Sequence, residues 1–269
     1  MASTSAPTPP TSRENYLFQI TLKDIQDPLI TRTLSCPEDA TFHEFHQAIM
    51  ISFNWAQTHE YNFQVFNDIA PSGTDSLLGI DYMSARPVAE FSDYEPEDFP
   101  QIGIPAPPKA VWKDSSKVKI CEYMAMSAYR DRHLQYEYDF GDGWEHAITH
   151  IGRAPRTEKF VCVGGEGHGA AEDAGGPFGW DELKEAYKTK SPSQSQKEKM
   201  WWYESFCTNG FNTGLSGDRA WRWSQERVNG QLVRLPEMVW KHDRKDDVCE
   251  LFWDQIGATK KVLTAPKDL

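Results

Sequence analysis

Cysteine is scarce in this sequence, and its placement excludes two structural classes. The 269 residues include 5 cysteines, an odd number with wide separations and no CxxC pair. Disulfide-stabilised folds and thiolate zinc sites need cysteines in even numbers or at close spacing. The sequence therefore predicts neither a disulfide framework nor a zinc site built from cysteines.

Long apolar runs are also absent. No stretch approaches the roughly 18 apolar residues that a membrane helix requires. The first residues, MASTSAPTPPTSREN, lack the apolar core of a secretory signal. These absences predict a cytoplasmic protein with no membrane partner, with the nucleus as the alternative location.

Positive charge is outnumbered. Lys and Arg total 28 against 40 Asp and Glu, which gives a formal net charge of -12. Such a field repels phosphate backbones and therefore disfavours nucleic acid as a partner. The sequence also lacks a GxxxxGKS or GxxxxGKT phosphate loop and a GxGxxG fingerprint between strand and helix. No nucleotide cofactor is expected.

Aromatic residues are abundant, at 13% of the chain within a hydrophobic fraction of 39%, which is enough for a packed core. Apolar residues alternate with polar ones over 16–22, which is typical of a strand with one buried face. A second strand is expected over 29–35. Thr41 and Glu44 then fit a capping box, which predicts a helix from there to about Phe53.

Alternation over 61–65 predicts a third strand. We therefore expect an α+β fold with a mainly antiparallel, curved sheet that starts strand-strand-helix-strand and carries helices on one face. Further strands are predicted over 118–123, 134–140, 144–151 and 160–163, and helices over 180–188 and 197–207.

The domain organisation follows from shifts in composition. We expect one domain over 15–235, preceded by a disordered tail of Ser, Thr and Pro over 1–14. Residues 67–117, rich in Pro, Gly and acids, are predicted to be a surface insertion. Residues 236–269 are predicted to be a C-terminal extension.

The segment YDFGDGWEH predicts a hairpin, because Asp142-Gly143 supplies the positive φ angles that a tight turn needs. If the loop holds only these two residues, Asp139 lies opposite His146, and an acid and a base share one face. A three-residue loop would place Phe140 opposite His146 instead. The same residues also fit a structural role, in which the acids brace the turn.

A second motif is the loop GGEGHGAAEDAGG, which contains Glu166, His168, Glu172 and Asp173. Its glycines permit close approach to a ligand, and they equally allow a long loop to cross the sheet. Its acids would repel a phosphate group unless a metal ion lay between them.

Three blocks of the sequence resemble the plasmid pRiA4b ORF-3-like family. YLFQITLKDIQDPLITR and FHQAIMISFNWAQTHEYNFQVF are similar to the family's opening. YEYDFGDGWEHAI is its most specific signature, and VCVGGEGHGAAEDAGGPFGWDEL resembles its loop of glycines and acids. Val228, Asn229 and Leu232 match its ending. Most members lack an assigned activity, so the resemblance implies positions and not a mechanism.

The resemblance implies which residues belong to the recurrent motifs. They are His59, Asp139, Asp142, Trp144, His146, Glu166, Glu172 and Asp173. The chain departs from the family at Gly169, Ala170 and Ala171, which stand where the family usually has Cys-Pro-Pro, so no cysteine-dependent role is carried over. The insertion over 67–117 is also longer than usual.

We expect a small-molecule enzyme whose cleft combines acids and histidine, with proton transfer in hydrolysis, isomerisation or cyclisation. The predicted catalytic residues are His146, Asp139 and Glu172, and the predicted binding residues are His59, Asp142, Trp144, Glu166 and Asp173. A divalent metal ion would suit the same chemistry, with His59, His146, Asp139 and Glu172 as candidate ligands.

Two alternatives to an enzyme remain open. One is a binding module that recognises a ligand or a protein without catalysis. The other is a nucleic-acid-processing protein, which the family's association with mobile elements suggests and the acidic composition disfavours. A small-molecule ligand is the favoured partner.

Overall fold

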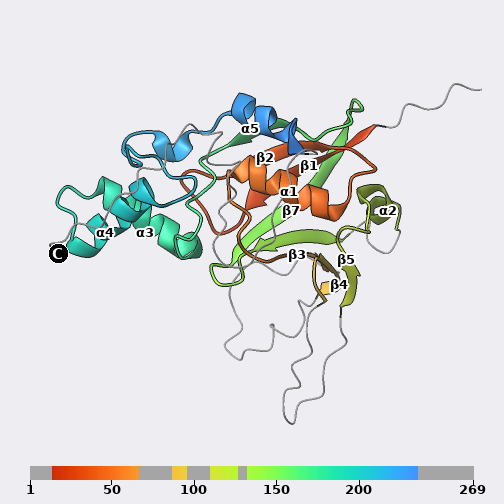
Figure 1. The fold of residues 1–269 in the computed structure, drawn as a ribbon, viewed down its shortest axis with the longest axis horizontal. Helices are drawn as coiled ribbons and strands as arrows, with labels where there is room; N and C mark the ends of the chain where they lie inside the picture. The colour runs from red at the N-terminus through yellow and green to blue at the C-terminus, as the bar shows by residue number, and fades with distance from the viewer. Residues whose placement is uncertain (1–13, 67–86, 96–109, 127–131, 236–269) are drawn as a thin grey trace, which may run out of the picture.

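The computed structural model describes residues 14–66, 87–95, 110–126 and 132–235, which build one eight-stranded sheet and five α-helices (Figure 1). The strands are β1 (Asn15–Leu22), β2 (Thr31–Cys36), β3 (Tyr61–Phe66), β4 (Pro87–Ser92), β5 (Val111–Asp114), β6 (His133–Tyr138), β7 (Trp144–Ala154) and β8 (Val161–Glu166). The helices are α1 (Phe42–Phe53), α2 (Ile120–Ala125), α3 (Gly176–Lys188), α4 (Gln194–Ser205) and α5 (Gln225–Leu232).

The sheet has the order β5-β4-β3-β6-β7-β1-β2-β8. All neighbouring strands are antiparallel except β4 and β5. The α+β fold expected from the sequence, opening strand-strand-helix-strand, is therefore confirmed. None of the described helices combines the length and apolarity that a membrane crossing requires.

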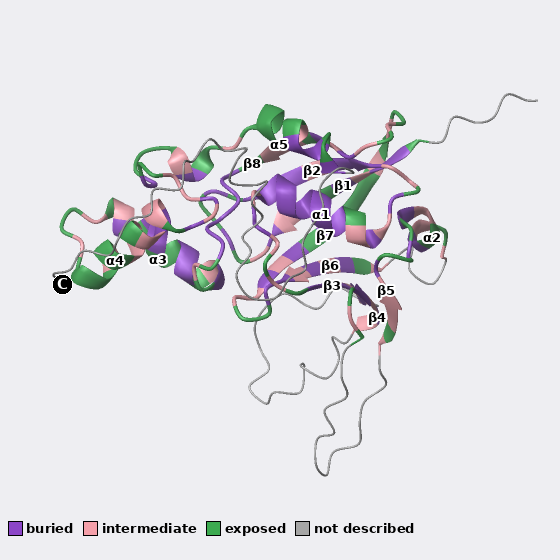
Figure 2. Cartoon of the chain, viewed as in Figure 1, coloured by how far each residue is buried: buried purple, intermediate pink, exposed green. Residues whose placement is uncertain are grey.

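Helix α1 lies against the sheet and is buried along almost its whole length (Figure 2). It begins with the predicted capping box, in which the Thr41 hydroxyl accepts from the Glu44 amide and the Glu44 carboxylate accepts from the Thr41 amide. Phe42 packs edge-on against Phe63 of β3, with ring centroids 4.9 Å apart. Helix α5 lies beside α1, whereas α3 and α4 pack together to one side of the sheet (Figure 1).

The sequence predicted a strand over 118–123, and this prediction is wrong. The segment leads into helix α2, whose first turn is capped by Glu122 accepting from the Lys119 amide. Ile120 and Tyr123 are both buried, and their separation of three residues fits one face of a helix. Over so short an interval, apolar residues such as Val118 and Ile120 fit a strand and a helix alike, so the pattern does not separate the two.

The interval 67–117, predicted to be a surface insertion, contributes β4 and β5 to the sheet. Ala89 and Phe91 of β4 are buried in the core. Strands of six and four residues are too short for alternation to emerge among Pro and acidic neighbours. Most of the predicted tail and the whole predicted extension over 236–269 lie outside the described residues.

Candidate functional site

Three loops that are distant in sequence bring His59, Asp139 and Asp173 together. His59 follows α1, Asp139 opens the turn between β6 and β7, and Asp173 lies in the glycine-rich loop after β8. The Nε2 atom of His59 is 2.7 Å from Oδ1 of Asp173 and 3.5 Å from Oδ2 of Asp139. One ligand atom from each residue lies within 4.8 Å of the others, and we call these three residues the His59 cluster.

The turn that carries Asp139 has five residues, so both predicted registers are wrong. Tyr138 pairs with Trp144, and Tyr136, not Asp139 or Phe140, lies opposite His146. Asp-Gly favours a tight turn but does not determine how many residues precede it. The predicted pairing of Asp139 with His146 is therefore corrected to a contact between Asp139 and His59.

The turn also orients the Asp139 carboxylate. Its Oδ1 atom accepts hydrogen bonds from the amides of Gly141 at 3.0 Å and Asp142 at 3.3 Å. One oxygen is thus committed to the turn, while Oδ2 is the atom nearest to His59. This is how the local backbone aims a single carboxylate oxygen at the cluster.

Close backbone contacts hold the glycine-rich loop in place. A side chain at Gly169 would lie 1.9 Å from the Phe53 carbonyl, and one at Gly176 would lie 2.2 Å from the Asp142 carbonyl. The Asp142 carboxylate also accepts from the Gly175 amide at 3.0 Å. Glycine is required at positions 169 and 176 because the loop passes directly over the end of α1 and the β6–β7 turn.

Unfavourable backbone conformations gather around the cluster. Of the seven non-glycine residues with positive φ in the described chain, five lie in these three loops. They are Asn54, Gln57, Asp139, Ala170 and Asp173. Asn and Asp adopt this region readily, whereas Gln and Ala do not. Strain of this kind costs on the order of 1–3 kcal/mol per residue and is typical of functional sites.

The cluster is partly open to solvent and dominated by negative charge. The side chains of His59, Asp139 and Asp173 are 34%, 11% and 49% exposed. The hydrogen bond to Asp173 raises the pKa of His59, burial opposes this, and the charge of Asp139 adds to the rise. Among the described residues, no lysine or arginine forms an ion pair with either aspartate.

Glu172 lies behind the cluster in the interior, with 1% of its surface exposed. Burial raises the pKa of its carboxyl group, and hydrogen bonds from Thr208, Tyr138 and the Ala56 amide oppose that effect. It contacts none of the three cluster side chains by hydrogen bond, so the structure places it under the site and not in it.

The structure does not bring His146 and Trp144 to the cluster. Both face the core because alternate residues of β7 point inward, and both are fully buried. His146 packs against Phe53 and Trp55, with ring centroids 4.8 and 5.4 Å away. Burial lowers its pKa to about 3. The catalytic role of His146 stays a prediction, and this placement weighs against it.

Two other predicted binding residues lie outside the His59 cluster. Glu166 is exposed on β8, and its carbonyl accepts from Arg32. Asp142 braces the glycine-rich loop, as described above, so it contributes to the position of Asp173 and not to the cluster itself.

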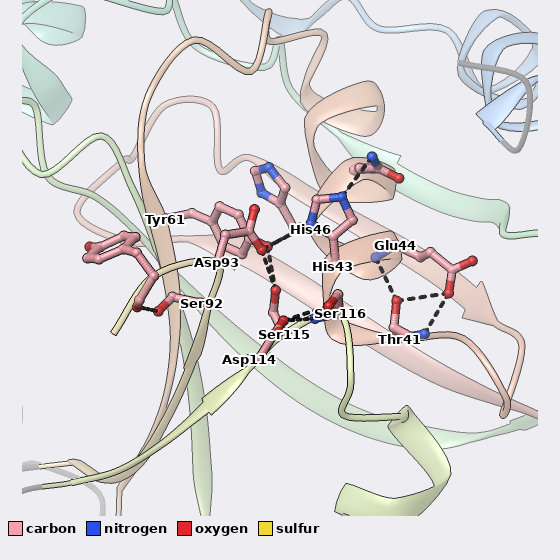
Figure 3. A network of polar contacts seen from close by, with 12 residues as sticks. Thr41, His43, Glu44, His46, Tyr61, Ser92, Asp93, Asp114, Ser115 and Ser116 are labelled. Carbon is pink, nitrogen blue, oxygen red and sulfur yellow. Dashed lines mark hydrogen bonds and ion pairs between the residues drawn. The ribbon is translucent and has the colours of Figure 1, made fainter. Parts of the chain in front are cut away.

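A second group of polar residues, which the sequence did not indicate, connects β4 and β5 to α1 (Figure 3). Oδ1 of Asp93 accepts from the Ser115 hydroxyl at 2.5 Å, the Tyr61 hydroxyl at 2.6 Å and Nδ1 of His43 at 3.1 Å. Tyr61 and Ser115 are buried. Because this one oxygen already receives three donors, we interpret the network as a structural link between the two parts of the sheet and the helix.

Comparison with known proteins places the chain in a family. A model of the plasmid pRiA4b ORF-3-like protein family matches residues 14–214, which include the whole His59 cluster. The chain belongs to this family. The pRiA4b ORF-3-like chain is 24% identical over 216 residues to the uncharacterized protein y4hQ of Sinorhizobium fredii, a match that covers 78% of this chain and 94% of that protein.

The pRiA4b ORF-3-like fold also has a counterpart among solved structures. The crystal structure of the protein of unknown function MM3350 from Methanosarcina mazei Go1 superposes with a TM-score of 0.54 at 20% identity. The match covers 80% of this chain and 98% of that one. At this identity the likeness supports the fold alone.

Proposed function

We propose that this protein is a metal-dependent enzyme that acts on a small molecule at the His59 cluster. The observation that supports this proposal is the convergence of one imidazole and two carboxylates from three separate loops within 4.8 Å. Ionisable groups gathered in this way, on strained backbone and with partly exposed side chains, are typical of reactive centres.

The donor set suits a divalent cation. Imidazole and carboxylate together fit zinc, manganese or iron. Three protein ligands would leave coordination positions open, which is typical of catalytic and not of structural metal sites. Asp139, Asp173 and the buried Glu172 supply up to three negative charges against a single imidazole, so a bound cation would relieve their mutual repulsion.

The chain's own residues would divide the work at this centre. A bound metal ion would supply Lewis acidity and make water a better nucleophile. Asp139, held by the Gly141 and Asp142 amides, would fix one ligand direction, and His59 would fix a second. Asp173 is the most exposed of the three, so substrate would approach from its side. Hydrolysis or another proton transfer on a small molecule is the reaction class that this arrangement favours.

The test is metal binding by the purified protein, followed by turnover. Calorimetry with Zn²⁺, Mn²⁺ and Co²⁺ should give one site per chain, lost in His59→Ala and in Asp173→Asn. His133→Ala is the matched control, because His133 is exposed on β6 and lies outside the cluster. If the wild-type chain binds none of these ions, or if His133→Ala and His59→Ala behave alike, the metal centre is refuted. Binding without turnover of any substrate would favour the binding module instead.

A further inference from the structure

The Glu172 carboxylate, which belongs to the glycine-rich loop, accepts hydrogen bonds from the two other segments that carry the His59 cluster, the loop after α1 and the end of β6. Its Oε1 atom accepts from the Tyr138 hydroxyl at 2.6 Å. Its Oε2 atom accepts from the Ala56 amide at 2.8 Å and the Thr208 hydroxyl at 2.6 Å. The carboxylate is buried, so these donors replace the water that an ionised carboxylate would otherwise bind.

Two of these three bonds reach a residue next to a member of the cluster or close before it, and the third reaches Thr208, whose segment carries no cluster residue. Glu172 itself precedes Asp173, and Tyr138 precedes Asp139. The loop that leads to His59 is held twice, by the Ala56 amide on Glu172 and by the Thr58 amide, which donates to the Tyr138 hydroxyl at 3.0 Å.

The directions of these hydrogen bonds are determined. The Tyr138 hydroxyl accepts from Thr58, so its single hydrogen is directed to Glu172. The Ala56 amide can only donate. Both carboxylate oxygens therefore act as acceptors, which an ionised carboxylate satisfies without an unpaired hydrogen. A neutral amide in its place would turn an N–H group toward one of these donors.

We infer that Glu172 is a positioning residue, which holds the three loops so that His59, Asp139 and Asp173 form one binding centre. This inference rests on the proposed metal-dependent function. Partners that orient metal ligands from behind typically change metal affinity 10- to 100-fold when they are replaced. Glu172 does so through the backbone of the loops, because its side chain forms no hydrogen bond with a cluster side chain, although its charge also raises the pKa of His59.

The first test compares three variants by metal calorimetry. Glu172→Gln should weaken binding by about 10- to 100-fold. Tyr138→Phe should weaken it as well, because it releases both Thr58 and Oε1. Thr208→Val is the matched control, since it removes a donor from the same carboxylate but its own segment carries no cluster residue, and its affinity should stay within about twofold of wild type. If Glu172→Gln does not fold, Tyr138→Phe against Thr208→Val decides the outcome.

A second test does not require the metal. The free energy of unfolding is measured in the presence of a chelator for His59→Ala, Asp173→Ala and the double variant. This double-mutant cycle gives the coupling energy between His59 and Asp173, and it is carried out in the wild-type background and in Glu172→Gln. We expect coupling in wild type and its loss in Glu172→Gln. Equal coupling in both backgrounds, or equal metal affinity in Glu172→Gln and wild type, overturns the positioning role. Loss of coupling in a protein that binds no metal supports the positioning role and refutes the metal centre.

Discussion

The side-chain amide of Asn229 bonds both backbone polar groups of Cys162. Its Oδ1 accepts from the Cys162 amide at 2.7 Å, and its Nδ2 donates to the Cys162 carbonyl at 2.9 Å. Strand β8 lies at the edge of the sheet, and this amide therefore pairs with it as a neighbouring strand would. Helix α5 covers an edge whose free backbone groups would otherwise invite another chain.

Asn229→Asp should destabilise the protein by about 1–3 kcal/mol, because the new carboxylate oxygen faces the Cys162 carbonyl and has no hydrogen to donate. Urea unfolding at neutral pH measures the change. Gln225→Ala is the control, because Gln225 donates only one bond to the same carbonyl, at 3.0 Å, and its loss should be smaller. An Asn229→Asp variant as stable as wild type would contradict this account of the edge.

Arg32 is a buried cation held by carbonyl groups and aromatic rings. It donates to the carbonyls of Ser52 at 2.7 Å, Thr31 at 2.6 Å, Glu166 at 2.8 Å and Gly167 at 3.0 Å. Burial lowers its pKa to about 10, so it stays charged at neutral pH. It thereby joins the end of α1 to β2 and to the start of the glycine-rich loop.

Arg32→Lys should cost about 2–4 kcal/mol of unfolding free energy, although it keeps the charge, because an ammonium group cannot reproduce the planar fork. The guanidinium also lies 4.6 Å from the Trp223 ring centroid, so its stacking on that ring is part of what is lost, and urea unfolding measures the change. Arg153→Lys, which alters an exposed arginine over Tyr16, is the control and should cost much less. If the two variants lost equal unfolding free energy, the hydrogen-bond geometry of the buried Arg32 guanidinium would not be the cause.

The network around Asp93 predicts a pH dependence with a definite sign. Burial alone would raise the pKa of Asp93, but hydrogen bonds from His43, Ser115 and Tyr61 outweigh it and hold the pKa below its usual 3.8. The hydrogen bond to Asp93 raises the pKa of His43 above 6.5. The contribution of ionised Asp93 to the free energy of unfolding is present above pH 3.8 and is lost as the pH falls through the pKa of Asp93 in the folded protein. The contribution of protonated His43 to the free energy of unfolding is present below pH 6.5 and is lost as the pH rises through the raised pKa of His43 in the folded protein.

The stability difference between wild type and Asp93→Asn should therefore be largest between about pH 4 and pH 6.5 and should shrink on either side. Measuring that difference by urea unfolding at each pH cancels groups that both proteins share. A difference that is constant from pH 4 to pH 8 would show that His43 does not titrate against Asp93.

Much of the fold could be predicted because its signals are local. Alternation over β1 and the capping box of Thr41 and Glu44 each lie within a few residues, and both were confirmed. The contact of His59 with Asp173 spans 114 residues, so the sequence could mark both as candidates but could not pair them. Thr208 carried no signal, because its hydrogen bond goes to a buried carboxylate from another loop. The register at Asp139 was predicted wrongly because Asp-Gly can end a turn of five residues as well as form a turn of two.

His146 has two interpretations, as a buried residue of the core and as a catalytic residue, and its pKa distinguishes them by experiment. Burial lowers its pKa from 6.5 to about 3, so the folded protein excludes a proton that the unfolded chain binds between these values. Stability should thus fall as pH drops from 6.5 toward 3, by up to about 1.4 kcal/mol per pH unit for this group.

His146→Phe keeps a ring of similar shape among Phe53 and Trp55 and cannot be protonated. Its unfolding free energy, measured at pH 7 and pH 5, should change less than that of wild type, while metal binding by the His59 cluster should be retained. The Nδ1 contact with the Trp144 carbonyl at 3.1 Å is lost, so some stability at pH 7 is lost as well. A folded His146→Phe protein that has lost metal binding or turnover would instead restore His146 to the functional site.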